Sequence, residues 1–322
     1  MNIEPTTTKH LVDPELLAGL GVFPNYDAND TTLKDLRGLV DEMTLPEDAY
    51  AQDDVEIERL TIDGPVGQIA INVFRPRDAV GPLPAYLHMH PGGLIFGTAE
   101  QSNPANVCTA SAVGCMVVSV DYRLAPEAKA PGALLDCYAA LQWLHKRARE
   151  LGVDPKKIAI GGESAGGGLA AALAQYARDQ GTYPVCFQLL IAPMLDDRPC
   201  AVGNLPPHVG EFVWTRASNR YAWSCYLGQE PGKADTPLYA VPARMDDLQN
   251  LPPAYIQVGA LDLFFPESVD YATRLLTAEC TAELHVVPAA YHGFELIEQA
   301  DVSARSRAEV RAALARAFCK VF

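Results

Sequence analysis

Short apolar segments that alternate with longer amphipathic ones constrain the fold of this chain more than any other feature. Several of the short segments are apolar throughout, as expected of strands that are covered on both faces. The alternation predicts an α/β fold, a mostly parallel central sheet with helices on both faces. We predict strands at residues 68–74, 85–90, 116–121, 158–160, 187–191, 254–258 and 283–287, and helices at residues 13–20, 31–43, 131–151, 165–180, 267–279 and 302–320.

One block interrupts the alternation. Residues 195–250 are rich in Pro, Asp and aromatic residues and contain no clear strand. Because long structureless loops are uncommon in compact domains, we predict that this block is a helical cap inserted into the core. Residues 1–60, which precede the regular alternation, are predicted to be an N-terminal cap segment. The core then comprises residues 61–194 and 251–322.

The charge of the chain excludes one class of partner. Its 322 residues include 40 Asp and Glu against 25 Lys and Arg, a net charge of −15. Residues 1–65 hold 15 of the acidic residues and only 4 of the basic ones, and we predict that residues 47–58 form a solvent-exposed loop or face. A nucleic acid partner is excluded, since binding to phosphates requires clusters of Lys and Arg.

Hydropathy and cysteine usage indicate a compartment. No apolar run approaches the roughly 18 residues that a membrane helix needs, so no membrane span is expected. Residues 1–13 lack the basic start and apolar stretch of a secretory signal. The eight cysteines are scattered without a Cys-x-x-Cys pair and are predicted to be free or buried thiols. These features predict a soluble cytoplasmic protein.

The pattern Gly-Glu-Ser-Ala-Gly at residues 162–166 is the strongest chemical signal in the chain. It follows the apolar run 158–160 and opens an Ala-rich helical segment. A serine flanked by small residues at a sharp strand-to-helix turn is held in a strained conformation with its hydroxyl exposed. Ser164 is therefore predicted to be a catalytic nucleophile.

A serine hydroxyl needs a general base, which is most often histidine. In this fold class the histidine follows the serine at the carboxyl end of a later strand. Of the histidines after Ser164, His208 lies in the Pro-rich insertion and His285 lies inside a predicted strand. His292 directly follows a strand and precedes Gly293, so we predict that His292 is the base.

The base in turn needs a carboxylate that orients it. Asp262 follows the apolar run 254–258 and is predicted to be this acid. Asp246 and Asp247 precede the same run and would lie at the wrong end of the strand. Glu267 is the alternative acid.

The oxyanion formed during acyl transfer needs fixed N–H donors. One is predicted to be the backbone N–H of Ala165, the residue after the nucleophile. The others are predicted to come from the loop His90-Pro91-Gly92-Gly93, which directly follows the apolar run 85–89. Glycine allows the backbone to approach the substrate closely.

These residues resemble the hormone-sensitive-lipase-like branch of the α/β-hydrolases, a group of carboxylesterases. The resemblance covers residues 65 to 295 and rests on five motifs in the family's order: H-P-G-G at 90–93, D-Y-R-L-A-P-E at 121–127, G-E-S-A-G at 162–166, L-P-P-A-Y-I-Q-V-G-A-L-D at 251–262, and H-G-F at 292–294. It implies an α/β-hydrolase fold, the triad Ser164, Asp262 and His292, and an oxyanion hole at Gly92 and Gly93. It also implies a cap built from the N-terminal segment and the insertion, where Trp223 with Tyr226 and Leu227 resembles a cap pattern.

The chain departs from the family pattern at two positions. Position 91 is proline where the family has glycine; proline has no N–H to donate, but it keeps His90 extended. We expect an intact but stiffer oxyanion loop. The second departure is Glu163, where aspartate is common and for which we predict only a local hydrogen-bonding role.

His88 and His90 form an H-x-H pair that can begin a metal site on a strand. No further ligand cluster with suitable spacing accompanies the pair, and we expect no metal and no organic cofactor. His90 is predicted to order the oxyanion loop and His88 to be a core residue. Asp121, Arg123 and Glu127 are predicted to be a polar network that supports the same loop.

Together these features predict a serine carboxylesterase whose partner is a small-molecule ester with a short to medium acyl chain. The substrate pocket is predicted to include Leu94, Phe212, Trp214 and Trp223. The same machinery also serves lactonases, amidases and acyltransferases, and a non-catalytic ligand receptor on the same fold is the alternative from another class. The terminal helix places Val310, Leu314, Phe318 and Val321 at helical spacing, which predicts packing on the sheet and leaves a homodimer open.

Overall fold

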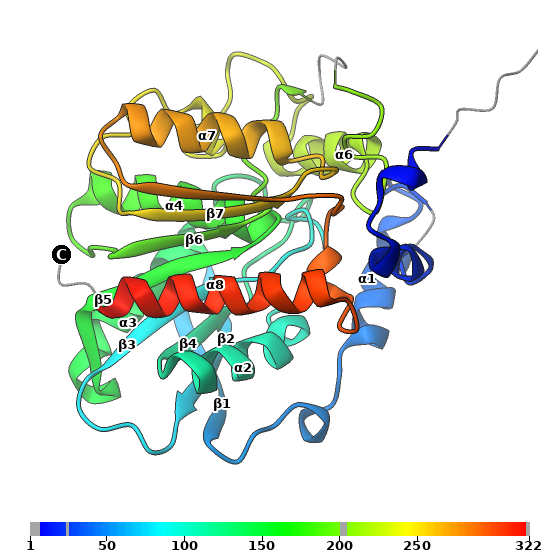
Figure 1. Cartoon of the computed structure of the whole chain (residues 1–322). Coiled ribbons are helices and arrows are strands. Elements are labelled where there is room, and N and C mark those ends of the chain that lie inside the picture. The colour runs from blue at the N-terminus through cyan, green and yellow to red at the C-terminus, as the bar shows by residue number, and fades with distance from the viewer. Residues whose placement is uncertain (1–6, 24–25, 200–204, 320–322) are drawn as a thin grey trace, which may run out of the picture.

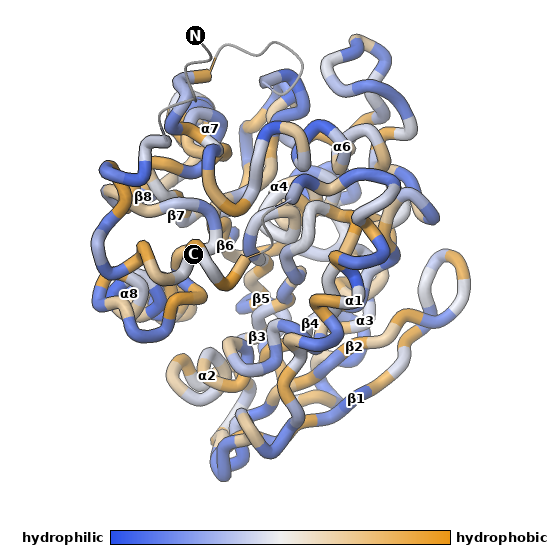
Figure 2. Tube along the Cα trace, turned by 90° about the vertical axis from the view of Figure 1, so that its right-hand side faces the viewer, coloured by the Kyte–Doolittle hydropathy of each residue, from blue (hydrophilic) through white to orange (hydrophobic). Residues whose placement is uncertain are grey.

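The computed structural model describes residues 7–23, 26–199 and 205–319, and its central feature is an eight-stranded sheet. The strands lie in the order β1-β2-β4-β3-β5-β6-β7-β8, with β1 and β2 antiparallel to their neighbours and the others parallel. Figure 2 looks along the strands, so that the labels β8 to β1 run diagonally across the molecule. The strands are β1 (Val55–Gly64), β2 (Gly67–Pro76), β3 (Leu83–Met89), β4 (Met116–Val120), β5 (Val153–Glu163), β6 (Phe187–Ile191), β7 (Ala254–Gly259) and β8 (Ala282–Val287).

The predicted fold class is confirmed, and each predicted strand lies within or overlaps an observed one. Strand β1 was not predicted, because acidic residues in its first half made this stretch look like a solvated loop. The alternation Val55-Glu56-Ile57-Glu58 was the available signal: Val55 is buried and Glu58 is exposed. β1 is an edge strand that pairs only with β2, so most of its length stays in contact with water.

The α-helices cover both faces of the sheet, as Figures 1 and 2 show. On one face, α2 (Asn103–Val113) and α8 (Asp301–Cys319) pack on alternate strand residues such as Tyr86 and Val117. On the other face, α3 (Gly132–Leu151), α4 (Ala165–Gln180) and α7 (Phe265–Thr277) pack on the intervening residues such as Leu87 and Val118. Helix α2 was not predicted, since its many small and polar residues give it little apolar periodicity.

The N-terminal segment and the insertion lie together on one side of the molecule, at the right of Figure 1. The N-terminal segment contains α1 (Leu33–Met43), and the insertion contains α6 (Arg216–Leu227). Hydrogen bonds join them: Ala28 N–H donates to Ser218, and Tyr221 donates to Asp30 at 2.9 Å each. The short 3-10 helices are η1 (Lys9–Leu11), η2 (Pro14–Gly21), η3 (Glu47–Ala49), η4 (Glu100–Ser102), η5 (Pro242–Arg244) and η6 (Phe294–Leu296).

The division into a core and two cap segments remains a proposal. The contacts between residues 27–30 and α6 support it, whereas the boundary at residue 60 falls inside β1. Within the described residues, no helix combines the length and the apolar character needed to cross a membrane.

Candidate active site

Ser164 occupies a strained turn between β5 and α4. Its φ is 55°, a left-handed conformation that residues other than glycine rarely adopt. The turn fits because its neighbours are glycines: a Cβ on Gly162 would lie 2.1 Å from the carbonyl oxygen of Met89, and one on Gly166 would lie 2.0 Å from the same atom. The start of α4 therefore lies directly against the end of β3.

The structure brings Ser164, His292 and Asp262 together. His292 Nε2 lies 3.0 Å from Ser164 Oγ, and His292 Nδ1 lies 2.8 Å from Asp262 Oδ2. An ionised Asp262 only accepts, so Nδ1 carries the proton and Nε2 is free to accept from the serine hydroxyl. All three side chains are buried, with exposed fractions of 5% for Ser164, 9% for His292 and 1% for Asp262.

The Asp262 side chain is itself held in place. Its Oδ1 accepts the N–H of Phe264 at 2.8 Å, and the Phe264 ring packs edge-on against His292 with ring centroids 5.2 Å apart. Within the described residues, the alternative acid Glu267 forms no hydrogen bond or ion pair with His292; its carboxyl group accepts the N–H of Leu195 at 2.6 Å.

The environment of His292 tunes its basicity. Burial lowers the pKa of His292, but the Asp262 carboxylate and, to a smaller extent, Glu295 raise it, so that the pKa lies above its ordinary value. Glu295 is the second residue of η6 and lies close enough to His292 to interact with it electrostatically. Burial raises the pKa of Glu295 to about 7, and the nearby Glu163 and Asp262 carboxylates add to this rise.

Gly92 and Gly93 lie in a loop whose backbone conformation favours glycine at both positions. Their φ values are 124° and 61°, and a Cβ on Gly92 would lie 2.0 Å from the carbonyl oxygen of Phe96. No acceptor in the described parts of the chain takes the N–H of Gly92 or Gly93. The N–H of Ala165, at the first position of α4, likewise has no intrahelical acceptor. These three donors are available to an oxyanion.

Proline at position 91 leaves this loop well ordered. His90 Nδ1 lies 2.7 Å from the Pro91 carbonyl oxygen, the His90 ring stacks on Tyr122 at 4.1 Å, and Tyr122 donates to the His90 carbonyl at 2.7 Å. The peptide bond between Pro91 and Gly92 is planar and trans, so its C=O and N–H point in opposite directions. His90 holds the Pro91 carbonyl on one side, and the N–H of Gly92 therefore points to the other side. Burial lowers the pKa of His90 to about 3, so this ring stays neutral.

His88 and His90 do not form a joint site. His88 lies between Ser119 Oγ and Glu163 Oε2, at 2.9 Å from each. Glu163 thus has the local hydrogen-bonding role expected of it. Among the described residues, one cluster has metal-ligand geometry: Glu283, His285 and Glu309. It includes neither His88 nor His90. Arg316 forms ion pairs with both carboxylates of this cluster.

The predicted polar network does brace the segment that follows the oxyanion glycines. Asp121 accepts the N–H of Ala99 at 3.0 Å. Glu127 pairs with Arg37 of α1, which also donates to the Ile95 carbonyl at 2.9 Å. Arg123 pairs instead with Asp136 of α3. The network therefore ties the oxyanion segment to both the cap and the core.

The four predicted pocket residues have different surroundings. Trp214 contacts Gly93 and lies beside His292, with ring centroids 6.4 Å apart. Phe212 packs against Tyr291, the residue before the predicted base. Leu94 is buried in the core cluster below the loop, and Trp223 is buried next to Tyr226. Four further residues near the site were not predicted, although each lies within a few residues of a predicted site residue: Phe96, Phe264, Tyr291 and Glu295.

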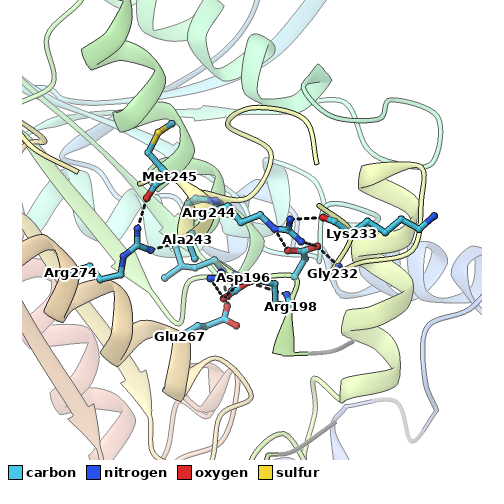
Figure 3. Close-up of polar contacts among 12 residues, drawn as sticks. Asp196, Arg198, Gly232, Lys233, Ala243, Arg244, Met245, Glu267 and Arg274 are labelled. Atoms are coloured by element: carbon cyan, nitrogen blue, oxygen red, sulfur yellow. Dashed lines mark hydrogen bonds and ion pairs between the residues drawn. The ribbon is translucent and has the colours of Figure 1, made fainter. Parts of the chain in front are cut away.

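A polar network beside the site fastens the insertion to the core (Figure 3). Glu267, in the first turn of α7, accepts the N–H groups of Leu195 and Asp196, where the insertion begins. Asp197, fully buried, makes a two-point ion pair with Arg244 at 2.7 and 2.8 Å and accepts the N–H of Gly232. Burial, together with the nearby Asp196 and Asp262, raises the pKa of Glu267 well above its ordinary value, which favours the neutral form of this carboxyl group.

The parallel sheet, the strained serine turn and the buried Ser–His–Asp arrangement define a serine hydrolase of the α/β-hydrolase class. A family model described as alpha/beta hydrolase fold matches residues 86–296. The chain belongs to this family, in its hormone-sensitive-lipase-like branch of carboxylesterases.

Named relatives agree with this assignment. The chain is 33% identical to Esterase LipI of Mycobacterium tuberculosis over 297 residues, which cover 89% of this chain and 88% of LipI. It is 33% identical to Carboxylesterase NlhH of the same species, over 90% of this chain and 91% of NlhH. Among solved structures, it is similar to a bacterial heroin esterase, with a TM-score of 0.90 and 40% identity over 98% of this chain and 100% of that one. Esterase LipW of Mycobacterium marinum gives a TM-score of 0.84 and 34% identity, over 97% and 98% of the two chains.

Proposed function

We propose that this chain hydrolyses carboxylic esters through a covalent acyl-enzyme on Ser164. The observation that carries the proposal is the buried His292 ring, within hydrogen-bond distance of Ser164 on one side and Asp262 on the other. The family assignment and the names of the relatives support the same reaction class.

The first half of the reaction forms the acyl-enzyme. His292 Nε2 takes the proton of Ser164 as Oγ bonds to the ester carbonyl carbon, and the carbonyl electron pair moves onto oxygen. The N–H groups of Gly92, Gly93 and Ala165 stabilise this oxyanion. When the carbonyl reforms, the bond to the alcohol oxygen breaks, and that oxygen receives the proton from His292.

The second half releases the acid. A water molecule gives a proton to His292 and adds its oxygen to the acyl carbon; collapse of the second oxyanion then returns the proton to Ser164 Oγ. Throughout, Asp262 holds the Nδ1 proton and stabilises the imidazolium. None of these steps requires a metal or an organic cofactor.

The proposed substrates are uncharged esters with short to medium acyl chains. The aromatic side chains of Trp214 and Phe264 lie against His292, Phe96 packs against Trp214, and together they support a small apolar site. An apolar site of limited size favours short acyl chains over long ones.

The test is hydrolysis of p-nitrophenyl esters from acetate to laurate by the wild type and Ser164→Ala. We expect wild-type turnover that falls with chain length beyond the medium range, and a loss of at least about 10⁴-fold in kcat for the variant. Ser111→Ala, which removes a hydroxyl of α2 that donates to Asp54, is the control and should keep its turnover. A folded wild type without turnover would contradict the proposal, as would a variant that keeps it.

A homodimer and residence in the cytoplasm remain part of the proposal. Leu314 and Phe318 of α8 are buried within the chain and Val310 is half-buried, whereas Val321 lies outside the described residues. A second copy would therefore have to use a surface other than the apolar side of α8, such as the outer edge of β8. Light scattering after size-exclusion chromatography measures the oligomeric state. The seven cysteines within the described residues are free, which supports a reducing compartment, and cell fractionation tests it.

A further inference from the structure

Residues 212–214 carry backbone strain beside the proposed active site. The N–H of Trp214 donates to the carbonyl of Phe212 at 2.8 Å, which closes a three-residue γ-turn around Val213. Val213 has a φ of 63°, a region that β-branched residues rarely adopt. Strain of this kind persists where the surrounding structure requires it, often at ligand sites. Here the turn directs the side chain of Trp214 inward from the cap insertion.

The orientation of the Trp214 indole is also held by a hydrogen bond. Its Nε1 donates to Asn219 Oδ1 at 3.2 Å, and Asn219, in the first half of α6, is 2% exposed. The ring of Phe96 packs beside it, with centroids 6.1 Å apart. Trp214 itself is 7% exposed. A large side chain fixed from three sides forms a rigid wall.

The Trp214 indole lies next to both Gly93 and His292, the two residues between which the reacting ester group must lie. A Cβ on Gly93 would be 2.5 Å from Trp214 Cη2, so the indole edge touches an oxyanion-loop residue. The other side of the indole faces His292, 6.4 Å away between ring centroids. The carbonyl oxygen of the substrate points to the N–H of Gly93, while the oxygen of the leaving alcohol must come within reach of His292 Nε2 to receive its proton.

We propose that Trp214 is the specificity-determining residue for the alcohol part of the ester, restricting it to small or flat groups. The inference rests on the proposed function, because it places the leaving oxygen next to His292. The acyl chain, which leaves the carbonyl carbon away from His292, is not limited by Trp214. Esters of bulky, branched alcohols are therefore poor substrates of the wild type.

Two substrate series test the inference with Trp214→Ala. The first series keeps the acetyl group and varies the alcohol, from phenyl acetate to cyclohexyl and menthyl acetate. The second keeps p-nitrophenol and varies the acyl chain from acetate to octanoate. We expect kcat/KM for menthyl acetate, relative to phenyl acetate, to rise about tenfold or more in the variant, with the acyl-chain profile unchanged. Asn219→Ala, which frees the indole without removing it, should give a smaller rise in the same ratio.

Controls separate the possible outcomes. Trp143→Ala removes a tryptophan from α3, away from the site, and should change neither profile. Trp214→Leu replaces Trp214→Ala if the latter does not fold, as judged by circular dichroism. An unchanged alcohol ratio, or a change in the acyl profile instead, would overturn the inference while leaving the esterase proposal intact. A folded wild type without activity on p-nitrophenyl acetate would overturn both.

Discussion

At the scale of single residues, the site depends on positions where no side chain fits. Gly93 combines a φ of 61° with the edge of Trp214, which occupies the space a Cβ would need. Any larger residue must displace either the loop or the tryptophan. The N–H proposed as an oxyanion donor would move with the loop.

Gly93→Ala is therefore expected to lower kcat by at least about 100-fold, the typical effect of losing an oxyanion donor. Gly181→Ala is the matched control, because Gly181 has a similar φ of 66° but no neighbouring atom within 4 Å of a Cβ. It should lose about 1 kcal/mol of stability and keep its kcat. Steady-state kinetics and thermal unfolding of both variants are the measurements; equal kcat values in the two would refute the prediction.

The pH dependence of kcat/KM also depends on individual side chains. His292 acts as a base only when neutral, so kcat/KM falls as pH drops through its pKa, which lies above the ordinary histidine value. An ionised Glu295 stabilises the imidazolium and so contributes to this rise. Glu295→Gln removes that charge, His292 then loses its proton at lower pH, and the acid limb of the kcat/KM profile shifts toward lower pH.

The control for this shift is Glu298→Gln, which removes an exposed carboxylate three residues further on. Its acid limb should coincide with that of the wild type in profiles measured from pH 5 to 9. An acid limb of Glu295→Gln that stays in place or moves to higher pH would show that Glu295 does not influence His292.

At the scale of secondary-structure elements, α7 connects the acid loop to the cap insertion. Its first turn follows Asp262 and carries Glu267, which holds the N–H groups of Leu195 and Asp196. The adjacent Met194 N–H donates to the carbonyl of Ser164 at 3.0 Å. One buried carboxyl therefore fixes the start of the insertion next to the nucleophile.

Burial raises the pKa of Glu267 and favours its neutral form, and glutamine is neutral, has the same shape and keeps an oxygen that can accept the two backbone N–H groups. We expect Glu267→Gln to unfold within about 1 kcal/mol of the wild type. Glu267→Leu leaves two buried N–H groups without an acceptor and should lose about 3 kcal/mol. Urea denaturation measures both, with Asp270→Asn on the exposed side of α7 as a control. Equal losses for Gln and Leu would contradict the role given to Glu267.

At the scale of the whole molecule, the net charge of −15 is concentrated in the N-terminal part of the chain. Asp35, Asp41 and Glu42 are exposed on or beside α1, the helix of the N-terminal cap segment. A field of this sign repels anionic substrates over distances up to a Debye length.

The kcat/KM for an anionic aryl hemisuccinate is therefore expected to rise roughly threefold between 10 and 300 mM NaCl, as salt screens the repulsion. The value for neutral p-nitrophenyl butyrate should change by less than about twofold. Initial-rate kinetics at both salt concentrations provide the comparison. A parallel response of the two substrates would indicate a general effect of salt on the protein rather than repulsion.

Local pattern alone was sufficient for the parallel part of the sheet and for most helices. A short run that is apolar throughout indicates a strand covered on both faces, and β6 and β7, which are buried at every position, show this clearly. β1 was missed because its acidic residues mask a short alternation, and α2 because its small and polar residues give it little apolar periodicity. β1 pairs with β2 along its length, and this pairing does not appear in the local pattern.

For the site, residues that are neighbours along the chain already identify the chemistry: they include the serine turn, the order of acid and histidine, and the glycine pair. What surrounds that chemistry depends on the tertiary structure. Folding pairs Asp262 with His292 and Glu267 with Leu195, places Trp214 against Gly93 and partly buries Glu295. The reason is physical: desolvation and contact depend on which residues meet in space, and local periodicity carries no information about partners as distant in the chain as Trp214 and Gly93.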